Sequence, residues 1–226
     1  MKFKAFALLL LTPILFSGCK ATDQQIQSWI EKNPDKILQV LMEHQKKQQE
    51  AGQPKDEDVK QNSAALFNNS SSPTLGNGPI KIAYFFDFNC GHCIKQSETI
   101  KNLMAKTDKV QIIFKNFAVL GPSSELTARA ALAAHQQNKY YEFYTEALKT
   151  REKNPETLKA IAQKLKLDVT KWQTDFESEA VKKELAHVSE LAGKMKLSGT
   201  PAIAISPDKI YAGRVDQLAE IIESIK

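Results

Sequence analysis

Two cysteines are the residues of this 226-residue chain best suited to chemistry. Cys90 and Cys93 form a C-x-x-C motif, with Gly91 and His92 between them. A disulfide across so short a loop removes little entropy from the unfolded chain, because that gain grows with loop length. A core of the size this chain can build also needs no such staple. We therefore expect the pair to react rather than to brace the fold.

The residues around the motif predict how its chemistry is tuned. Residues 80–88 are mostly apolar and aromatic, which is typical of a buried strand, and a helical pattern runs from Cys93 to Lys106. Cys90 would then lie at a helix N-terminus, where unpaired N–H groups and the helix dipole favour a thiolate. With His92 as a nearby donor or positive charge, we expect its pKa to fall from about 8.5 to roughly 3.5–7.5. Cys93, one turn inward and more buried, would attack the mixed disulfide and release a substrate.

Zinc binding is the alternative use of a C-x-x-C motif, which supplies two of the four ligands. A second cysteine pair is absent from the sequence. His44, His135 and His187 lack the spacing that would complete a site. We therefore favour redox chemistry at the two sulfurs, with no metal and no cofactor.

The first residues of the chain predict export. Lys2 and Lys4 precede an apolar stretch at residues 5–16. That stretch is shorter than the roughly 20 residues that span a bilayer, so residues 1–18 are predicted to be a signal peptide. The chain carries 31 basic and 26 acidic residues, a formal charge of +5, which loss of Lys2 and Lys4 reduces to +3. A charge this small gives no reason to expect a nucleic-acid partner.

The end of this stretch predicts a lipid anchor. Phe16-Ser17-Gly18-Cys19 resembles a bacterial lipobox, in which the cysteine receives diacylglycerol. Ordinary cleavage after Ala21, which would discard Cys19, is the alternative. In both cases Cys90 and Cys93 are the cysteines that remain for chemistry in an oxidising compartment.

The rest of the pattern predicts a strand–helix–strand unit with parallel strands, into which helices are inserted. The expected elements are helices at 23–32, 34–50, 56–67 and 93–106, strands at 74–75, 80–88 and 110–117, helices throughout 123–197, a hairpin at 201–205 and 210–212, and a final helix at 215–225. The apolar faces of the first two helices must pack on the main domain or on another chain. Tyr140, Tyr141, Phe143 and Tyr144 repeat at helical spacing and are predicted to be core rather than a substrate groove.

These motifs together resemble the DsbA family of thiol–disulfide oxidoreductases, in the thioredoxin superfamily. The resemblance is carried by Cys90-Gly91-His92-Cys93 after an aromatic strand, a helical insertion, and Ser198-Gly199-Thr200-Pro201 before a late strand. Residues 72–77 and 120–124 resemble more narrowly the lipoprotein and dimeric branch of that family, the suppressor-of-copper-sensitivity protein C and Com-like outer-membrane proteins. The similarity covers about residues 23–226.

The resemblance implies an α/β chain with a thioredoxin fold, an inserted helical domain and an N-terminal helical extension. The implied segments are a lipoprotein signal peptide at 1–18, a helical dimerisation extension and linker at 19–55, a first part of the thioredoxin domain at 56–122, the helical insertion at 123–197, and a second part with the cis-proline at 198–226.

The resemblance also implies the residues that surround the two sulfurs. Gly91 and His92 would tune the redox pair. Pro201 would follow a cis peptide bond, and the backbone of Thr200 would pair with an extended substrate peptide. The residues alone indicate no more than a proline at the start of a strand.

Two positions depart from the pattern of the superfamily. Tyr84 stands six residues before Cys90, where many members carry a buried acid. The dipeptide Gly91-His92 replaces the Pro-His common in monomeric DsbA. Asp87 would point to the other side of the strand, so we assign it no role in proton transfer.

The implied function is a periplasmic enzyme, anchored by lipid to the envelope of a Gram-negative bacterium, that forms or isomerises disulfides through Cys90 and Cys93. Its partners would be cysteine-containing exported proteins, a membrane redox protein of unknown identity and a second copy of the chain. The N-terminal extension and Thr200 favour the isomerase role over the oxidase role. The alternative is a non-catalytic envelope lipoprotein that uses a thioredoxin-like fold to bind a metal or a partner.

Overall fold

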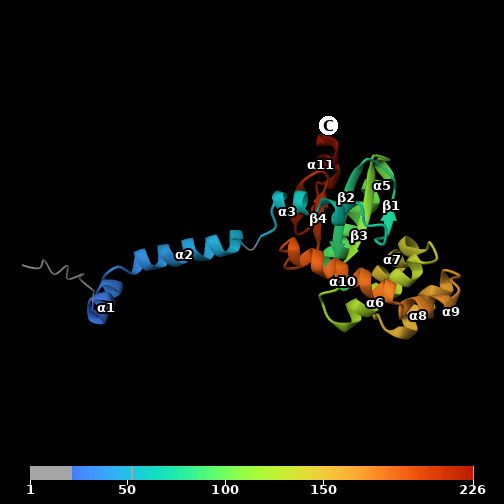
Figure 1. The fold of residues 1–226 in the computed structure, drawn as a ribbon, viewed down its shortest axis with the longest axis horizontal. Coiled ribbons are helices and arrows are strands. Elements are labelled where there is room, and N and C mark those ends of the chain that lie inside the picture. Colours follow the sequence, from blue (N-terminus) through green and yellow to red (C-terminus); the bar gives the residue numbers. More distant parts are fainter. Residues whose placement is uncertain (1–21, 52, 226) are drawn as a thin grey trace, which may run out of the picture. The chain divides into compact units, whose positions relative to one another are not determined.

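The computed structural model describes residues 22–51 and 53–225, which fall into two units, one before and one after residue 52. The N-terminal unit consists of helices α1 (Asp23–Lys32) and α2 (Pro34–Ala51) (Figure 1). The side chain of Thr22 accepts a hydrogen bond from the Gln25 N–H, and the Gln25 side chain accepts one from the Thr22 N–H. This capping box satisfies two N–H groups at the start of α1. The predicted break between two helices is confirmed, with proline at the first position of α2.

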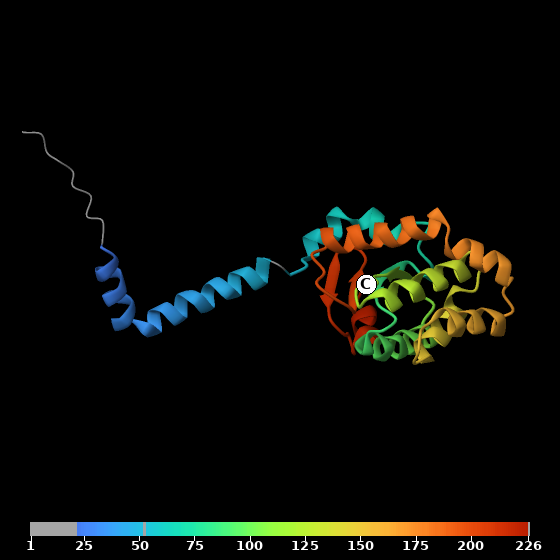
Figure 2. The same cartoon turned by 90° about the horizontal axis from the view of Figure 1, so that it is seen from below.

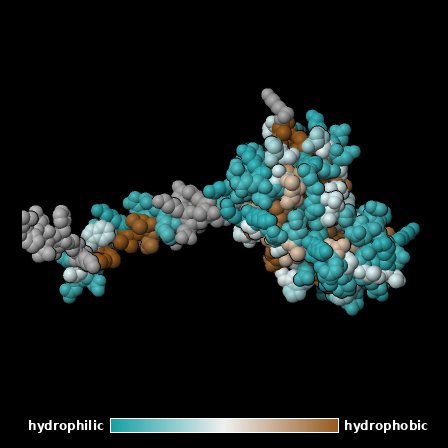
Figure 3. All heavy atoms as spheres, in the orientation of Figure 1, coloured by the Kyte–Doolittle hydropathy of each residue, from teal (hydrophilic) through white to brown (hydrophobic). Residues whose placement is uncertain are grey.

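The apolar side chains of these two helices are exposed. Between 44 and 66% of the surface of each is accessible, and together they form what we call the N-terminal apolar face: Ile26, Trp29, Ile30, Leu38, Val40, Leu41 and Met42. Figure 3 shows hydrophobic surface, in brown, along α1 and α2. Each helix therefore presents an apolar surface that nothing in its own unit covers.

The main unit is built on a five-stranded sheet in the order β1-β3-β2-β4-β5. Its strands are β1 (Thr74–Leu75), β2 (Ile80–Phe86), β3 (Val110–Asn116), β4 (Ala202–Ile205) and β5 (Lys209–Ala212). β2 and β3 are parallel and the other pairs are antiparallel. A parallel pair needs a crossover, and helix α5 (Gly91–Lys106) provides it. The C-terminal end of β2 therefore leads directly into the N-terminus of α5.

Helices cover both faces of this sheet. Besides α5 they are α3 (Asp56–Gln61), α4 (Ser63–Phe67), α6 (Pro122–His135), α7 (Tyr140–Lys149), α8 (Pro155–Lys164), α9 (Val169–Phe176), α10 (Glu179–Lys194) and α11 (Leu218–Ser224). Along β2, Tyr84 and Phe86 face a core formed with α5, α6, α7 and α11, while Ala83 and Phe85 face a second core with α3, α4 and α10. Figure 2 shows α5 and α11 on one side of the sheet, and α4 and α10 on the other.

The structure confirms the predicted helical insertion and its core. Helices α6 to α10 occupy it, and asparagine, aspartate and serine side chains cap α8, α9 and α10. Tyr140, Phe143 and Tyr144 are buried and the half-buried Tyr141 packs against the same core, which confirms that the aromatic cluster belongs to the core.

Several predicted element boundaries are wrong, among them the start of the final helix, which is Leu218 in α11 rather than residue 215. The helix expected at 56–67 is divided into α3 and α4 at Asn62, whose side chain and backbone both donate to the Asp58 carbonyl and end the first helix. β2 ends at Phe86 rather than at residue 88, because the Asp87 carboxylate accepts a hydrogen bond from the Asn89 N–H and turns the chain out of the sheet. For the same reason α5 begins at Gly91, two residues earlier than expected.

Within the described residues, no helix combines the length and the apolar character that a membrane crossing requires.

Candidate active site

The two cysteines of the motif lie at the N-terminus of α5, just after the short loop that connects it to β2. Cys90 is the N-cap residue of α5, with φ −80° and ψ 112°. This extended backbone directs its sulfur back over the helix, where Sγ accepts a hydrogen bond from the Cys93 N–H at 3.3 Å. Both thiols are free, so the structure describes the reduced pair. The predicted location at a helix N-terminus is confirmed.

Burial makes the two thiols unequal. Cys90 keeps 7% of its surface exposed, whereas Cys93 keeps none. The pKa of Cys93 is raised to about 12, mainly by burial and in addition by the Cys90 side chain. The inner cysteine is therefore a thiol at neutral pH, and the outer sulfur is the one that a large molecule can reach.

The predicted cis-proline loop lies against Cys90. The Thr200–Pro201 bond is cis, as expected, and the Cys90 thiol donates a hydrogen bond to the Thr200 carbonyl at 3.3 Å. Pro201 is buried, while Thr200 is partly exposed. A second cis bond, at Ser206–Pro207, was not expected.

Gly91 and His92 are both exposed on the first turn of α5. A Cβ atom built on Gly91 would meet no heavy atom within 4 Å, so no steric contact requires glycine there. The redox-tuning role of these two residues stays a prediction.

Asp87 braces the turn that carries Cys90. Its side chain is 1% exposed and accepts hydrogen bonds from Ser124 Oγ at 2.7 Å and from the N–H groups of Val119 at 2.8 Å and Leu120 at 3.0 Å, besides the Asn89 N–H at 2.7 Å. These four donors occupy the carboxylate, in keeping with the expectation that it takes no part in proton transfer. Sequence reasoning missed this bracing role, because three of the four donors lie more than 30 residues further along the chain.

Tyr84 closes the inner side of the site. Its hydroxyl donates to the Cys93 carbonyl at 3.1 Å, and its ring stacks on Phe86 with centroids 5.1 Å apart. Burial raises the pKa of this tyrosine well above its usual value. The sequence marked the position as a departure, and the structure shows a phenol facing the inner cysteine.

Exposed apolar side chains lie on the segments next to the motif. Ile94 follows Cys93 on α5 and is 37% exposed, and Val119 and Leu120, held by Asp87, are 44% and 55% exposed. In the sequence, the only indication of this feature is the pair of apolar residues before Gly121.

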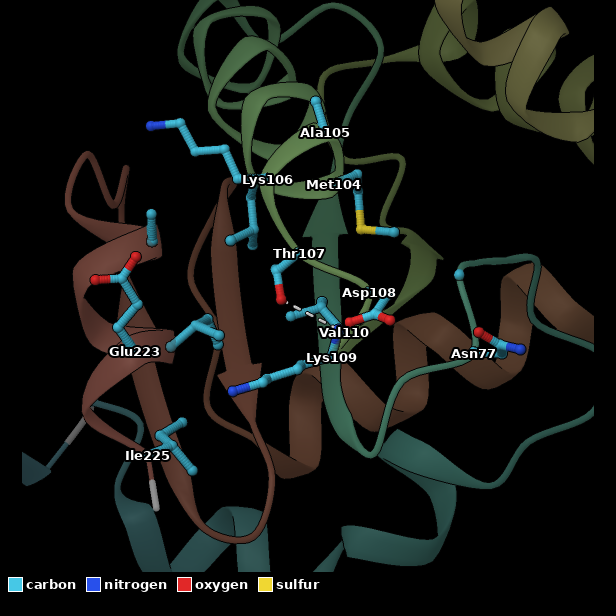
Figure 4. A pocket seen from close by; sticks show the side chains of 14 residues that line it. Asn77, Met104, Ala105, Lys106, Thr107, Asp108, Lys109, Val110, Glu223 and Ile225 are labelled. Carbon is cyan, nitrogen blue, oxygen red and sulfur yellow. Dashed lines mark hydrogen bonds between the residues drawn. The ribbon is translucent and has the colours of Figure 1, made fainter.

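A pocket of about 810 Å³ lies at the other end of α5. Figure 4 shows Lys106, Asp108, Lys109 and Glu223 around it, with the Thr107 hydroxyl accepting from the Lys109 N–H at 3.2 Å. At 1.5 Å per residue, this end of the helix is about 20 Å from Cys93. The pocket therefore takes no part in chemistry at the sulfurs.

Cys19, the predicted lipidation residue, lies outside the described residues.

Comparisons with known proteins place the chain in a family. A family model described as thioredoxin matches residues 68–224. The chain is 30% identical over 165 residues to the probable disulfide bond formation protein D of Bacillus cereus, covering 66% of this chain and 76% of that protein. It is 31% identical to a thioredoxin-like oxidoreductase of Silicibacter pomeroyi, with a TM-score of 0.67 over 72% of this chain and 94% of that one. The chain therefore belongs to the thioredoxin family, and the predicted fold and thiol–disulfide oxidoreductase class are confirmed.

One solved structure matches the fold over more of the chain. Proteus mirabilis ScsC in a transitional conformation covers 92% of this chain and 97% of its own, with a TM-score of 0.67 and 20% identity. This likeness extends beyond the region matched by the family model.

Proposed function

We propose that this protein is a periplasmic thiol–disulfide oxidoreductase that forms and isomerises disulfides in exported proteins through Cys90 and Cys93. The observation that carries the proposal is the environment of the Cys90 sulfur, which lies 3.3 Å from the Cys93 N–H and 3.3 Å from the Thr200 carbonyl. The N–H and the helix dipole stabilise negative charge on that sulfur. The names of the relatives, a disulfide bond formation protein and a thioredoxin-like oxidoreductase, support the same activity.

The chemistry is thiolate–disulfide exchange in either direction. As an oxidase, the Cys90–Cys93 disulfide is attacked at Cys90 by a substrate thiolate, and Cys93 leaves as a thiolate and takes up a proton. A second substrate cysteine then attacks the mixed disulfide and forms the product. As an isomerase, the reduced Cys90 attacks a wrong disulfide, and a substrate cysteine or Cys93 resolves the intermediate.

The cis-proline loop is the proposed docking site for the substrate backbone. Thr200 is partly exposed and its carbonyl is already directed at Cys90, so an extended peptide that pairs with this loop would bring its own sulfur to Cys90. We propose Gly91 and His92 as the residues that tune the redox pair from the exposed first turn.

The decisive experiment is an assay of insulin reduction and of refolding of scrambled ribonuclease. We expect Cys90→Ala to abolish both activities, and Cys93→Ala to accumulate mixed disulfides with substrate on Cys90. Asp108→Asn, at the far end of α5, is the matched surface control and should keep full activity. Activity in Cys90→Ala equal to that of the wild type would remove the enzyme and favour the alternative, a non-catalytic envelope lipoprotein that binds a metal or a partner.

We propose further that Cys19 carries a lipid anchor and that the chain is a homodimer. The lipobox-like residues 16–19 support the anchor, and the exposed N-terminal apolar face supports self-association. Expression in a Gram-negative host followed by membrane fractionation tests the anchor. Cys19→Ala should move the protein from the envelope to the soluble periplasmic fraction, and an unchanged distribution would contradict lipidation.

The balance between oxidase and isomerase depends on a membrane redox partner of unknown identity. A dimer favours the isomerase role. Trapping thiols in intact cells distinguishes the two: a reduced Cys90–Cys93 pair supports isomerisation, and an oxidised pair supports disulfide donation.

A further inference from the structure

A buried hydroxyl beside the redox pair has no partner. Tyr144, on α7, is 3% exposed, and its hydroxyl makes no hydrogen bond with any described residue. Tyr84 and Ser97 lie close enough to influence the pKa of Tyr144, yet neither completes a hydrogen bond with it. Buried polar groups are almost always paired, so an unpaired one in this place calls for an explanation.

Ring contacts connect Tyr144 to Tyr84, which contacts Cys93. Phe86 stacks on Tyr84 and meets the Tyr144 ring edge-on, with both pairs of centroids 5.1 Å apart. Tyr84 in turn donates to the Cys93 carbonyl at 3.1 Å. Burial is the main cause that raises the pKa of both tyrosines, and the nearby Cys93 thiol raises both further. The two hydroxyls and the inner sulfur therefore share one buried environment.

The proposed chemistry places negative charge on the Cys93 sulfur, which a further hydrogen-bond donor would stabilise. Cys93 leaves as a thiolate when substrate attacks the disulfide at Cys90, and it becomes a thiolate again when it resolves a mixed disulfide. Burial opposes that charge and outweighs the Asp87 backbone and the Thr200 side chain, which favour it, as the pKa of about 12 indicates. The titratable groups that face the sulfur are Cys90, Tyr84 and Tyr144, and Thr200 adds a polar group from the cis-proline loop. The nearby Asp87 carboxylate is already occupied by its four donors.

We propose that the Tyr144 hydroxyl donates a hydrogen bond to the Cys93 sulfur while it is a thiolate, and that Tyr84 positions this sulfur through the Cys93 carbonyl. The inference rests on the proposed function and names residues that serve its inner half-reaction. In the resolving step, Cys93 loses its proton and its thiolate attacks Cys90. The Cys90–Cys93 bond forms, the bond from Cys90 to the substrate sulfur breaks, and the departing substrate thiolate takes up one proton. Tyr144 keeps its own proton throughout.

The test compares Tyr144→Phe with Tyr140→Phe. Tyr140 is a buried tyrosine of the same helix that stacks on Tyr144, but its hydroxyl is satisfied by Asn116 Oδ1 at 2.9 Å. Two rates are measured by stopped flow: reduction of the Cys90–Cys93 disulfide by glutathione, and resolution of a glutathione mixed disulfide on Cys90. We expect Tyr144→Phe to slow both by roughly tenfold at pH 7, because it removes a hydrogen bond to a charged group.

Three further readouts separate this role from a merely structural one. The rate–pH profile of resolution should shift to higher pH in Tyr144→Phe, since its Cys93 ionises less readily. The reduction potential at pH 7 should stay that of the wild type, because forward and reverse rates fall together. The melting temperature should be unchanged or higher, because an unpaired buried hydroxyl has been removed. Tyr84→Phe should show the same shift in rate with a lower melting temperature.

Wild-type rates in Tyr144→Phe across the pH range would overturn the inference, as would an equal loss in Tyr140→Phe. Neither result touches the proposed function, which fails only if Cys90→Ala retains activity.

Discussion

The two thiols of the site differ in their exposure to solvent and therefore in their reactivity. Cys93 is fully buried with a pKa raised to about 12, while Cys90 lies at the surface end of the same turn. We therefore expect iodoacetamide at pH 8.5 to alkylate Cys90 and leave Cys93 unmodified in the folded, reduced protein. Peptide mass spectrometry checks this, with the protein unfolded in guanidinium as the control in which both react. Equal modification of both cysteines in the folded protein would contradict the assigned asymmetry.

Asp87 is the residue near the site whose loss should cost the most stability. Replacing it with alanine leaves the buried Ser124 hydroxyl and the N–H groups of Val119 and Leu120 without their acceptor. We expect Asp87→Ala to lower the free energy of unfolding by about 3 kcal/mol, measured by urea denaturation. The exposed Asp108→Ala should change it by less than about 0.5 kcal/mol. Similar values for the two variants would show that the four hydrogen bonds of Asp87 are energetically unimportant.

At this scale the sequence predicted which residues react but not what surrounds them. Cys90, Cys93 and the cis bond before Pro201 follow from local motifs and a family resemblance. The partners of Asp87 and the unpaired Tyr144 hydroxyl do not, because they depend on contacts between segments far apart in the chain.

A buried lysine connects several elements on the face of the sheet that packs against α3, α4 and α10. Lys115, on β3, is fully buried and donates to Ser72 Oγ and to the Ala65 carbonyl, both at 2.9 Å. Ser72 in turn donates to Glu184 Oε1 at 2.6 Å. This chain of hydrogen bonds connects β3, the segment before β1, α4 and α10. Burial is the main cause that lowers the pKa of Lys115 to about 8, and Glu184 opposes the shift.

The titration of Lys115 makes stability depend on pH. Its pKa is lower in the folded protein than the 10.5 of the free side chain, so between pH 8 and 10.5 the unfolded state binds more protons. Stability from this group therefore rises with pH across that window. The free energy of unfolding of the wild type, relative to Lys115→Met, should increase by about 2 kcal/mol from pH 7.5 to pH 9.5. A relative stability that stays constant or falls would show that Lys115 does not titrate as described.

Comparison with the variant is needed because Cys93 acts in the opposite direction. Its pKa is raised from 9.0 to about 12 on folding, so its contribution to stability falls as the pH rises through this range. Both proteins carry Cys93, and its effect cancels in the difference.

The elements were largely predictable from periodicity. The apolar run at β2, the helical period of α5 and the Asn33-Pro34 pair at the start of α2 predicted the element types. Their ends were less predictable, because Asn62 and Asp87 end elements through side-chain hydrogen bonds that a hydrophobic pattern does not record. Nothing in the sequence indicated the Lys115 network, because lysine side chains are mostly exposed and a lysine within a strand is therefore predicted to face solvent.

For the whole molecule, the N-terminal apolar face is the feature that predicts assembly. Trp29, Leu38 and Leu41 are about half exposed on α1 and α2, and exposed apolar surface of this kind marks interaction sites. We expect the mature chain to have the mass of a dimer by light scattering, and a variant lacking residues 20–55 to be a monomer. A monomer in both would remove the basis for the isomerase role.

A substitution test localises the interface without removing the segment. Leu38→Glu with Leu41→Glu should dissociate the dimer, whereas Gln39→Glu on the same helix should not. Retention of the dimer in the double variant would place the interface elsewhere.

The hydrogen bond from the Cys90 thiol to Thr200 links the redox state of Cys90 to the mobility of the cis-proline loop. The helical insertion leaves the sheet after β3 through a backbone held by Asp87, and it returns to β4 through Thr200, held by Cys90. Oxidation takes the hydrogen from the protonated Cys90 sulfur, so the hydrogen bond to Thr200 is lost while those of Asp87 persist. At an acidic pH that keeps reduced Cys90 protonated, we expect faster deuterium uptake at residues 198–200 in the oxidised than in the reduced protein, and equal uptake at residues 119–120. A partner protein can thus distinguish the oxidised from the reduced enzyme by the mobility of residues 198–200, without contacting the sulfur.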